Sequence, residues 1–296
     1  MANSNRDTLI VEDCELTHIA CHPDEQYILK LHAPRIAERA APGSFVHLTC
    51  EPSMAMRRPL SIMRASADDG WIEVLFKPVG AGTAALAARS IGDTLSAIGP
   101  IGNGFIPKDE RPLRLLIGGG VGIPPVLFLS EVLNRAGSSP ALVIMGSEVP
   151  FPFDLARTDS RLPGVPSDIN STIAELEAQG IPTRLASLQG YGGCYNGYVT
   201  ALAEHWLANL SADELTQVEI FACGPNPMLA ATAKVAENFG IPAQVSLEEF
   251  MACAVGGCAG CTVRVSHGNE VAMKRVCVDG PVFDSASIDW AALASH

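Results

Sequence analysis

The chain has 296 residues, of which 48% are hydrophobic and 18% are charged, and its formal net charge is −12. This composition provides enough apolar residues for buried cores and excludes a disordered chain, and the length predicts two domains, or three if one is small. The acidic charge argues against nucleic acid or an anionic lipid surface as the main partner.

Residues 1–110 predict a barrel of short antiparallel strands. Segments with strand composition lie at 27–31, 44–48 and 71–76, and turn-forming Pro, Gly and Asp residues separate them. Closely spaced short strands of this kind are typical of an antiparallel β-barrel.

Residues 111–243 predict alternating strands and helices. The strands are expected at 113–117, 141–145, 183–187 and 218–222, and the helices at 124–135, 169–179, 199–207 and 228–239. A loop rich in Pro and Asp covers roughly 150–167. This alternation favours an α/β domain with a parallel sheet and helices on both faces.

Residues 244–296 carry four of the nine cysteines. The spacing C-x4-C-x2-C, followed after fifteen intervening residues by a fourth cysteine, is the plant-type pattern for a [2Fe–2S] cluster; its members are Cys253, Cys258, Cys261 and Cys277. A four-cysteine zinc site and unliganded buried thiols are the alternatives, although zinc favours paired C-x2-C motifs. A hairpin of 262–266 and 270–272 would close back to the last cysteine of a small cluster domain.

Two motifs in the barrel segment are suited to a diphosphate. Arg58 and Ser61 lie three residues apart on one extended segment, where the guanidinium and the hydroxyl can reach the same anion. Further along, glycines precede a helix that begins near Gly82 and Thr83, and free N–H groups at such a position bind anions. A plain strand and turn, and a simple helix cap, are the alternative interpretations.

Two further motifs follow strands of the α/β domain. A glycine-rich turn stands where a nucleotide pyrophosphate binds, although it does not match the Rossmann fingerprint; it contains Gly118, Gly119, Gly120 and Gly122. The last predicted strand leads into Cys223, Gly224 and Pro225, at the edge where open parallel sheets bind ligands. An ordinary glycine-rich turn and a buried core thiol are the alternatives.

The cysteines and the apolar stretches bear on the cellular compartment. An odd number of cysteines behind a polar N-terminal segment does not predict a secreted disulfide scaffold. The longest apolar stretch, 115–129, is shorter than the roughly 18 residues of a membrane span, and it is interrupted by glycines and prolines. We therefore expect a cytoplasmic protein outside the membrane, with thiols that stay reduced or bind metal.

In chain order, these motifs resemble the ferredoxin-reductase family, in which a flavin barrel precedes a nicotinamide domain. The strings Arg-Pro-x-Ser, Lys-x-x-Gly-x-Gly-Thr, Gly-Gly-Gly-x-Gly and Cys-Gly-Pro-x-Pro-Met occur here in that order. The segments 246–253 and 275–283 resemble the electron-transfer subunits of two-subunit, NAD-dependent dihydroorotate dehydrogenases. The resemblance spans roughly residues 8–288.

The resemblance implies a role for each matching position. FAD would be bound by Arg58, Pro59, Leu60, Ser61, Leu75, Phe76, Lys77, Gly82 and Thr83. NAD(H) would be received by Gly118, Gly119, Gly120, Gly122, Cys223, Gly224 and Pro225. The [2Fe–2S] cluster would be ligated by Cys253, Cys258, Cys261 and Cys277. Hydride passes directly between the nicotinamide and flavin rings, so no acid–base residue is expected, and Lys77 would stabilise negative charge on the reduced flavin.

The resemblance also implies an oxidoreductase subunit of pyrimidine biosynthesis. In that family an FMN-containing catalytic subunit oxidises dihydroorotate, electrons run through FMN, the cluster and FAD to NAD⁺, and the complex is a heterotetramer. Two other functions stay open. One is an NAD(P)H-dependent reductase for a different acceptor, such as a ferredoxin, and the other is a non-catalytic redox sensor or adaptor.

The region 150–193 departs from this pattern because it is longer than the family needs and contains a glycine-rich turn at 189–195. Glu148 is a candidate for binding a ribose hydroxyl, with a solvated acid as the alternative. No obvious pair of arginines for a 2′-phosphate is evident in the sequence, which favours NAD over NADP.

Overall fold

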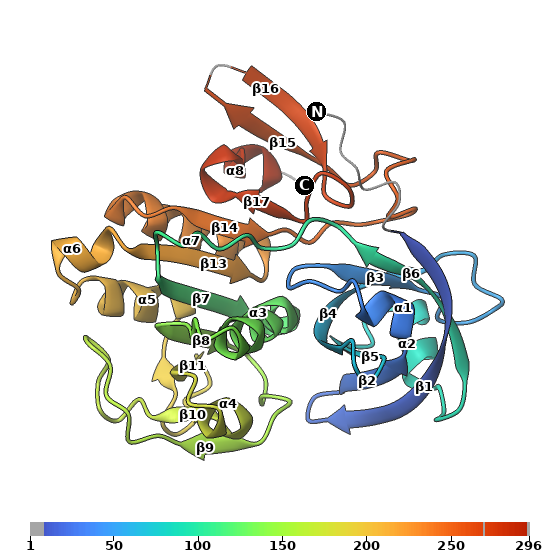
Figure 1. Cartoon of the computed structure of the whole chain (residues 1–296), viewed down its shortest axis with the longest axis horizontal. Coiled ribbons are helices and arrows are strands. Elements are labelled where there is room, and N and C mark those ends of the chain that lie inside the picture. The colour runs from blue at the N-terminus through green and yellow to red at the C-terminus, as the bar shows by residue number, and fades with distance from the viewer. Residues whose placement is uncertain (1–8, 269, 295–296) are drawn as a thin grey trace.

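The computed structural model describes residues 9–268 and 270–294. Figure 1 shows a barrel beside a sheet covered by helices, with a hairpin above them. The polar N-terminal segment and the outer ends of the first and third expected domains lie outside the described residues.

The N-terminal part is a closed barrel with the strand order β1-β2-β5-β4-β3-β6. Its strands are β1 (Ile10–His22), β2 (Gln26–His32), β3 (Phe45–Leu48), β4 (Arg58–Ser66), β5 (Trp71–Phe76) and β6 (Thr94–Ile101), with the short helices α1 (Pro34–Ala37) and α2 (Ala81–Ala87). All neighbouring strands pair antiparallel, so the predicted barrel is confirmed. Alternate residues such as Leu29, Leu31, Ile72 and Val74 fill its interior, as a period of two requires.

The second part is a seven-stranded sheet with the order β12-β11-β8-β7-β13-β14-β17. Its strands are β7 (Leu113–Gly119), β8 (Leu142–Gly146), β11 (Thr183–Ser187), β12 (Tyr195–Asn196), β13 (Val218–Cys223), β14 (Ala243–Ser246) and β17 (Val282–Asp284). Every pair is parallel except β14 with β17. The α/β prediction is confirmed, with one antiparallel strand added at the edge.

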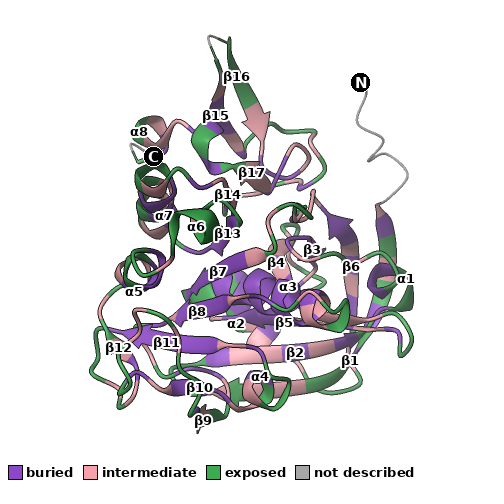
Figure 2. Cartoon of the chain, turned by 60° about the vertical axis from the view of Figure 1, so that its left-hand side comes forward, coloured by how far each residue is buried: buried purple, intermediate pink, exposed green. Residues whose placement is uncertain are grey.

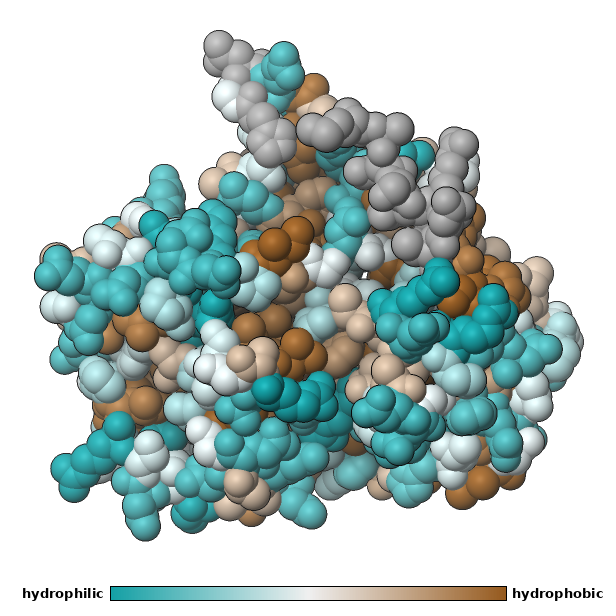
Figure 3. Space-filling view, in the orientation of Figure 1, coloured by the Kyte–Doolittle hydropathy of each residue, from teal (hydrophilic) through white to brown (hydrophobic). Residues whose placement is uncertain are grey.

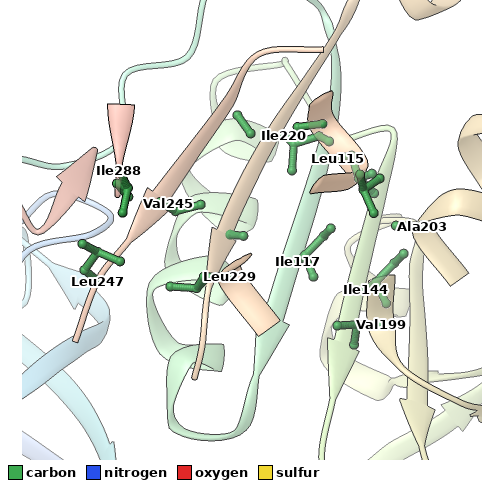
Figure 4. Packing of buried hydrophobic residues seen from close by; sticks show 14 of the residues in the cluster. Leu115, Ile117, Ile144, Val199, Ala203, Ile220, Leu229, Val245, Leu247 and Ile288 are labelled. Atoms are coloured by element: carbon green, nitrogen blue, oxygen red, sulfur yellow. The ribbon is translucent and has the colours of Figure 1, made fainter. Parts of the chain in front are cut away.

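Helices cover both faces of this sheet. The helix α3 (Ile123–Arg135) packs on one face, and α5 (Val199–Leu207) and α7 (Asn226–Phe239) pack on the other. Figure 4 shows the second layer, where Leu115, Ile117 and Ile220 of the sheet meet Val199 and Leu229 of the helices. Their packing holds the ends of β7 and β13 side by side.

The prediction of a helix over 169–179 is wrong in its first half. Ser171–Ile173 forms strand β10, which pairs with β9 (Leu155–Arg157), and the helix α4 is confined to Ala174–Ala178. The β-branched Thr172 and Ile173 are buried in this ladder, which suits an extended conformation. The predicted loop 150–167 correspondingly contains a strand.

The C-terminal segment, which carries the four closely spaced cysteines, contacts both the barrel and the sheet. The hairpin of β15 (Thr262–His267) and β16 (Glu270–Arg275) is confirmed, and α8 (Trp290–Leu293) follows it. On the sheet side, β17 pairs with β14, and on the barrel side the Asn103 amide donates to the carbonyl of Asp279 at 3.0 Å. Figure 2 shows that the sheet strands are buried while β16 is largely exposed.

Among residues 9–268 and 270–294, no helix is both long and apolar enough to cross a bilayer.

Candidate functional site

A cavity of about 660 Å³ opens where the barrel, the sheet and the segment leading into the cysteines meet. Figure 3 shows apolar side chains gathered in the middle of this face, between the barrel and the sheet. Eight of the nine residues expected to bind FAD line this cavity: Arg58, Pro59, Leu60, Ser61, Leu75, Phe76, Lys77 and Thr83. Strands β4 and β5 supply most of them, because the two are antiparallel neighbours in the barrel.

The ninth residue, Gly82, lies against the Arg58 side chain. A Cβ atom at Gly82 would lie 2.6 Å from Nε of Arg58, so only glycine lets the guanidinium lie this close to α2. Nη1 of Arg58 donates to the carbonyl oxygens of Met56 at 2.9 Å and Arg57 at 3.1 Å. These bonds leave other guanidinium N–H groups for an anion in the cavity.

The hydroxyl of Thr83 serves as an internal cap of α2. Its Oγ1 accepts from the backbone N–H groups of Val79 at 3.0 Å and Gly80 at 3.3 Å. These bonds correspond to the simple helix cap that the sequence left open as the alternative to an anion site. Thr83 also lines the cavity.

Aromatic and charged side chains of β5 border the cavity. Phe76 is stacked on Tyr27, with ring centroids 5.6 Å apart and planes inclined by 20°. Lys77 follows β5 and forms an ion pair with Asp24, so its charge is partly compensated by a neighbouring carboxylate.

The two loops expected to receive the nicotinamide nucleotide lie against each other. Cys223 is paired in register with Gly118 at the ends of β13 and β7. A Cβ atom at Gly122 would lie 2.5 Å from the backbone nitrogen of Gly224, so these loops touch backbone to backbone. Of this region, Val121 and Asn226 line the cavity. None of the seven expected nicotinamide residues lines the cavity: Gly118, Gly119 and Cys223 end strands β7 and β13, and Gly120, Gly122, Gly224 and Pro225 follow them.

Cys223 is a fully buried thiol. Burial raises its pKa well above the usual range, and the charge of Glu248 adds to this increase. The thiol is therefore neutral at physiological pH.

One wall of the cavity was not predicted from the sequence; it is formed by the six residues Ser246, Leu247, Glu248, Glu249, Phe250 and Met251. Phe250, one of these lining residues, is 95% exposed. Glu248 is open to solvent through the cavity, yet protein atoms surround its carboxyl group on most sides, and this burial raises its pKa. The motif was visible in the sequence, but its contact with the barrel was not.

The four expected cluster cysteines lie on the loop 253–261 and on the turn after β16. Cys258 is exposed, whereas Cys261 and Cys277 are buried. The Cys253 sulfur accepts from the backbone N–H of Cys258 at 3.4 Å, and the Cys258 sulfur accepts from Gly260 at 3.4 Å. Among the described residues, no three His, Cys, Asp or Glu side chains are already grouped around one metal position.

The loop is shaped to stabilise sulfur anions. Ala254 and Ala259 adopt positive φ values of 55°, which turn backbone N–H groups toward the sulfurs. Burial acts to raise the pKa of Cys253, but hydrogen bonds from the backbone of Cys258 and Val255 lower it to about 7. The pKa of Cys277 is raised to about 12 by burial and by its contact with Cys261. Four thiols with N–H donors around them fit an iron–sulfur cluster.

Glu148 and the region 150–193 lie beyond β8. Glu148 is exposed. Arg157 of β9 donates to the Asn170 side chain at 2.7 Å and lies over the glycine turn at Gly193. None of these residues lines the cavity described above.

A family model for the iron–sulfur cluster binding domain of dihydroorotate dehydrogenase B matches residues 248–289. The electron-transfer subunit of dihydroorotate dehydrogenase B (NAD⁺) from Geobacillus kaustophilus is 34% identical to the chain, over 90% of the chain and 93% of that protein. The corresponding subunit from Desulforamulus reducens is 31% identical, over 89% of the chain and 92% of that protein.

Solved structures share the fold over most of the chain. The structure of an NADH-dependent reduced ferredoxin–NADP oxidoreductase is 26% identical, with a TM-score of 0.73, over 95% of this chain and 91% of that chain. The ferredoxin reductase of a carbazole 1,9a-dioxygenase is 20% identical, with a TM-score of 0.62, over 79% of this chain and 67% of that chain. The second likeness concerns the fold alone.

Proposed function

The chain belongs to the family of electron-transfer subunits of dihydroorotate dehydrogenase B, and on this premise we propose that it passes electrons between NAD(H), FAD and a [2Fe–2S] cluster. Its physiological partner is an FMN-containing catalytic subunit that oxidises dihydroorotate. The protein is an oxidoreductase subunit of pyrimidine biosynthesis.

One observation carries this proposal: both ends of the cysteine-bearing segment border the barrel cavity. Met251 lines the cavity, and Cys253 lies two residues further along the chain. On the other side, Pro281 lines the cavity four residues after Cys277. Since two residues span at most about 7 Å, a flavin in the cavity and a cluster on the cysteines are near neighbours.

The residues of the chain bind and orient, and the bound groups supply the redox chemistry. Arg58 and Ser61 would hold the FAD diphosphate, and Leu75, Phe76 and Lys77 would lie along the isoalloxazine. Cys253, Cys258, Cys261 and Cys277 would hold the cluster. When bound, the flavin converts hydride transfer from nicotinamide into single-electron transfer to the cluster. The thiol of Cys223 is buried and neutral, so it adds no charge beside the nicotinamide site.

Further parts of the proposal concern assembly and location. The complex is a heterotetramer of two catalytic and two electron-transfer subunits, and the chain divides at 110 and 243 into FAD, NAD and cluster domains. NAD rather than NADP is the nucleotide. We place the protein in the cytoplasm, which agrees with nine cysteines that are all free thiols.

The test is an anaerobic NADH titration of the full-length protein, reconstituted with FAD, iron and sulfide, and followed by visible absorption and low-temperature EPR. Bleaching of the flavin together with a rhombic reduced-cluster signal is the expected result. Flavin and cluster that NADH does not reduce would overturn the nicotinamide assignment and favour a redox sensor. Failure to bind iron under anaerobic conditions would overturn the cluster assignment.

A second experiment identifies the partner. Mixing the reduced protein with an FMN-containing dihydroorotate dehydrogenase subunit should transfer electrons to that flavin, and dihydroorotate should then reduce NAD⁺ through the complex. The matched control carries Arg58→Gln, which should lose FAD while keeping the cluster. Electron transfer that persists without FAD would contradict the proposed order of carriers.

A reductase for a different acceptor is the second candidate function. The likeness to the NADH-dependent ferredoxin–NADP oxidoreductase, at 26% identity over 95% of the chain, favours it. A protein of this kind would reduce ferredoxin rapidly with NADH and would not form a complex with the FMN-containing subunit.

A further inference from the structure

A second cavity, of about 440 Å³, lies under the segment 158–170, in the region expected from the sequence to be longer than the family needs. It shares no lining residue with the flavin cavity. Leu162 and Val165 pack against the hydrophobic core of the sheet, so the segment is anchored over the cavity. The volume is in the range of small-molecule sites, which begin at about 300 Å³.

A buried arginine forms part of its wall. Arg184 of β11 is only 2% exposed, and its Nε has no hydrogen-bond partner. Nη1 donates to the carbonyl of Thr183 at 2.8 Å, and Nη2 donates to the carbonyl of Ser160, which lies on the cavity wall. No carboxylate of the described residues lies within ion-pair distance of this guanidinium. The carboxylate of Glu177 acts on this guanidinium only from beyond ion-pair distance. A buried cation without a contacting counter-ion is unfavourable, and an anion would relieve that cost.

The other lining groups favour the same kind of ligand. Arg161 adds a second cation, against one exposed carboxylate at Asp159. Hydroxyl and amide groups complete the polar wall at Thr158, Ser160, Ser167 and Asn170. In a chain with a net charge of −12, a cavity with two arginines and one aspartate is locally positive.

We propose that this cavity binds a small anion with carboxylate or phosphate oxygens, held by Arg184 and Arg161. A planar guanidinium suits both groups, because it can donate two parallel N–H bonds to either. The site is separate from the flavin and nicotinamide sites, so the proposal does not depend on the function proposed above.

Isothermal titration calorimetry of the full-length holoprotein tests it, with inorganic phosphate in one arm and succinate in the other. FAD and a saturating concentration of NAD⁺ are present, so that the nucleotide phosphate sites are filled. Saturable binding of one or both probes is expected, and the arm that binds identifies the anion. Arg184→Met should weaken this binding at least tenfold, and Arg184→Lys should weaken it less, because the charge is kept.

Two variants separate binding from folding. Arg161→Ala changes an exposed side chain and should weaken the anion severalfold without altering stability. Arg114→Met is the matched control, because Arg114 is also buried with an unpartnered Nε but does not line the cavity. It should leave the anion affinity unchanged. The proposal is overturned if neither probe binds, or if Arg184→Lys and Arg161→Ala both bind like the wild type.

Discussion

The 660 Å³ cavity proposed to bind flavin and the loop 253–261 proposed to bind the cluster are built in different ways. The cavity is walled by barrel strands and by loops whose backbones touch, and the hydrophobic cores behind them hold these elements in place. The loop 253–261 has little packing of its own. Cys258 and much of the loop are exposed, and its shape depends on backbone N–H groups that donate to sulfur.

This difference indicates which of the two sites depends on its ligand for an ordered structure. A cavity shaped by packed strands retains its form through the stability of the whole domain. A loop held by its sulfur contacts derives much of its order from the bonds that the cysteines form. Substitutions near the cavity should therefore change affinity or global stability, whereas substitutions in the loop should act on the cluster alone.

The largest effect is expected for Cys258→Ser. Loss of one thiolate should abolish stable cluster assembly and reduce electron transfer to the partner subunit by about a hundredfold or more, because every ligand of the cluster is needed. NADH reduction of an artificial dye through FAD should remain. Iron content and EPR measure cluster assembly, and dye reduction measures electron transfer through FAD. Cys21→Ser, at an exposed thiol of the barrel, is the control, and a Cys258→Ser protein with full iron would contradict the assignment.

A pair of glycine substitutions tests the packing difference directly. A Cβ atom at Gly122 would lie 2.5 Å from the backbone of Cys223, whereas one at Gly257 would meet no atom within 4 Å. Gly122→Ala should therefore raise KM for NADH and cost about 3 kcal/mol of stability, because two backbones must separate. Gly257→Ala should change the stability by less than about 0.5 kcal/mol. Chemical denaturation measures the stability of both variants, and steady-state kinetics measures their KM for NADH. Equal effects of the two substitutions would contradict the proposed difference in packing.

The barrel should lose stability in mild acid because of His47. Its side chain is 2% exposed and neither ring nitrogen has a hydrogen-bond partner. Burial, with the charge of Arg57, lowers its pKa from 6.5 to about 4. The unfolded chain takes up this proton below pH 6.5 but the folded chain does so only near pH 4, so stability falls across that interval.

The expected loss attributable to His47 between pH 7 and pH 5 is about 2 kcal/mol. Urea unfolding at both pH values measures it. His47→Gln should remove this part of the pH dependence, and His18→Gln, at an exposed histidine of β1, should leave it unchanged. The same pH dependence in both variants would show that other groups cause it.

The smallest effect is expected for Lys77. If its charge stabilises the reduced flavin, Lys77→Met lowers the flavin potential by about 20 mV, because an exposed ion pair with Asp24 already compensates part of the charge. Asp24→Asn should shift the potential upward. Potentiometric titration measures both, and an unchanged potential in Lys77→Met excludes this role.

Most elements could be predicted from local patterns. The strand Trp71–Phe76 and the helix Val199–Leu207 have the predicted bounds, because their hydrophobic periods agree with their tertiary contacts. The helix expected over 169–179 failed over its first five residues, because pairing with β9 outweighed helical propensity there. Strands β1 and β6 were not identified, because their place in a closed barrel depends on partners far apart in sequence.

By itself, the sequence determined the order of the three parts, the cysteine spacing and the motifs proposed to bind phosphate, because these depend on residues close together in the chain. Only the tertiary structure brought Phe45, Val121, Asn226 and Pro281 to one cavity, placed 246–251 against the barrel, and buried Arg184 without a carboxylate at ion-pair distance. Those features depend on which strands become neighbours, and that is decided by packing across the whole chain.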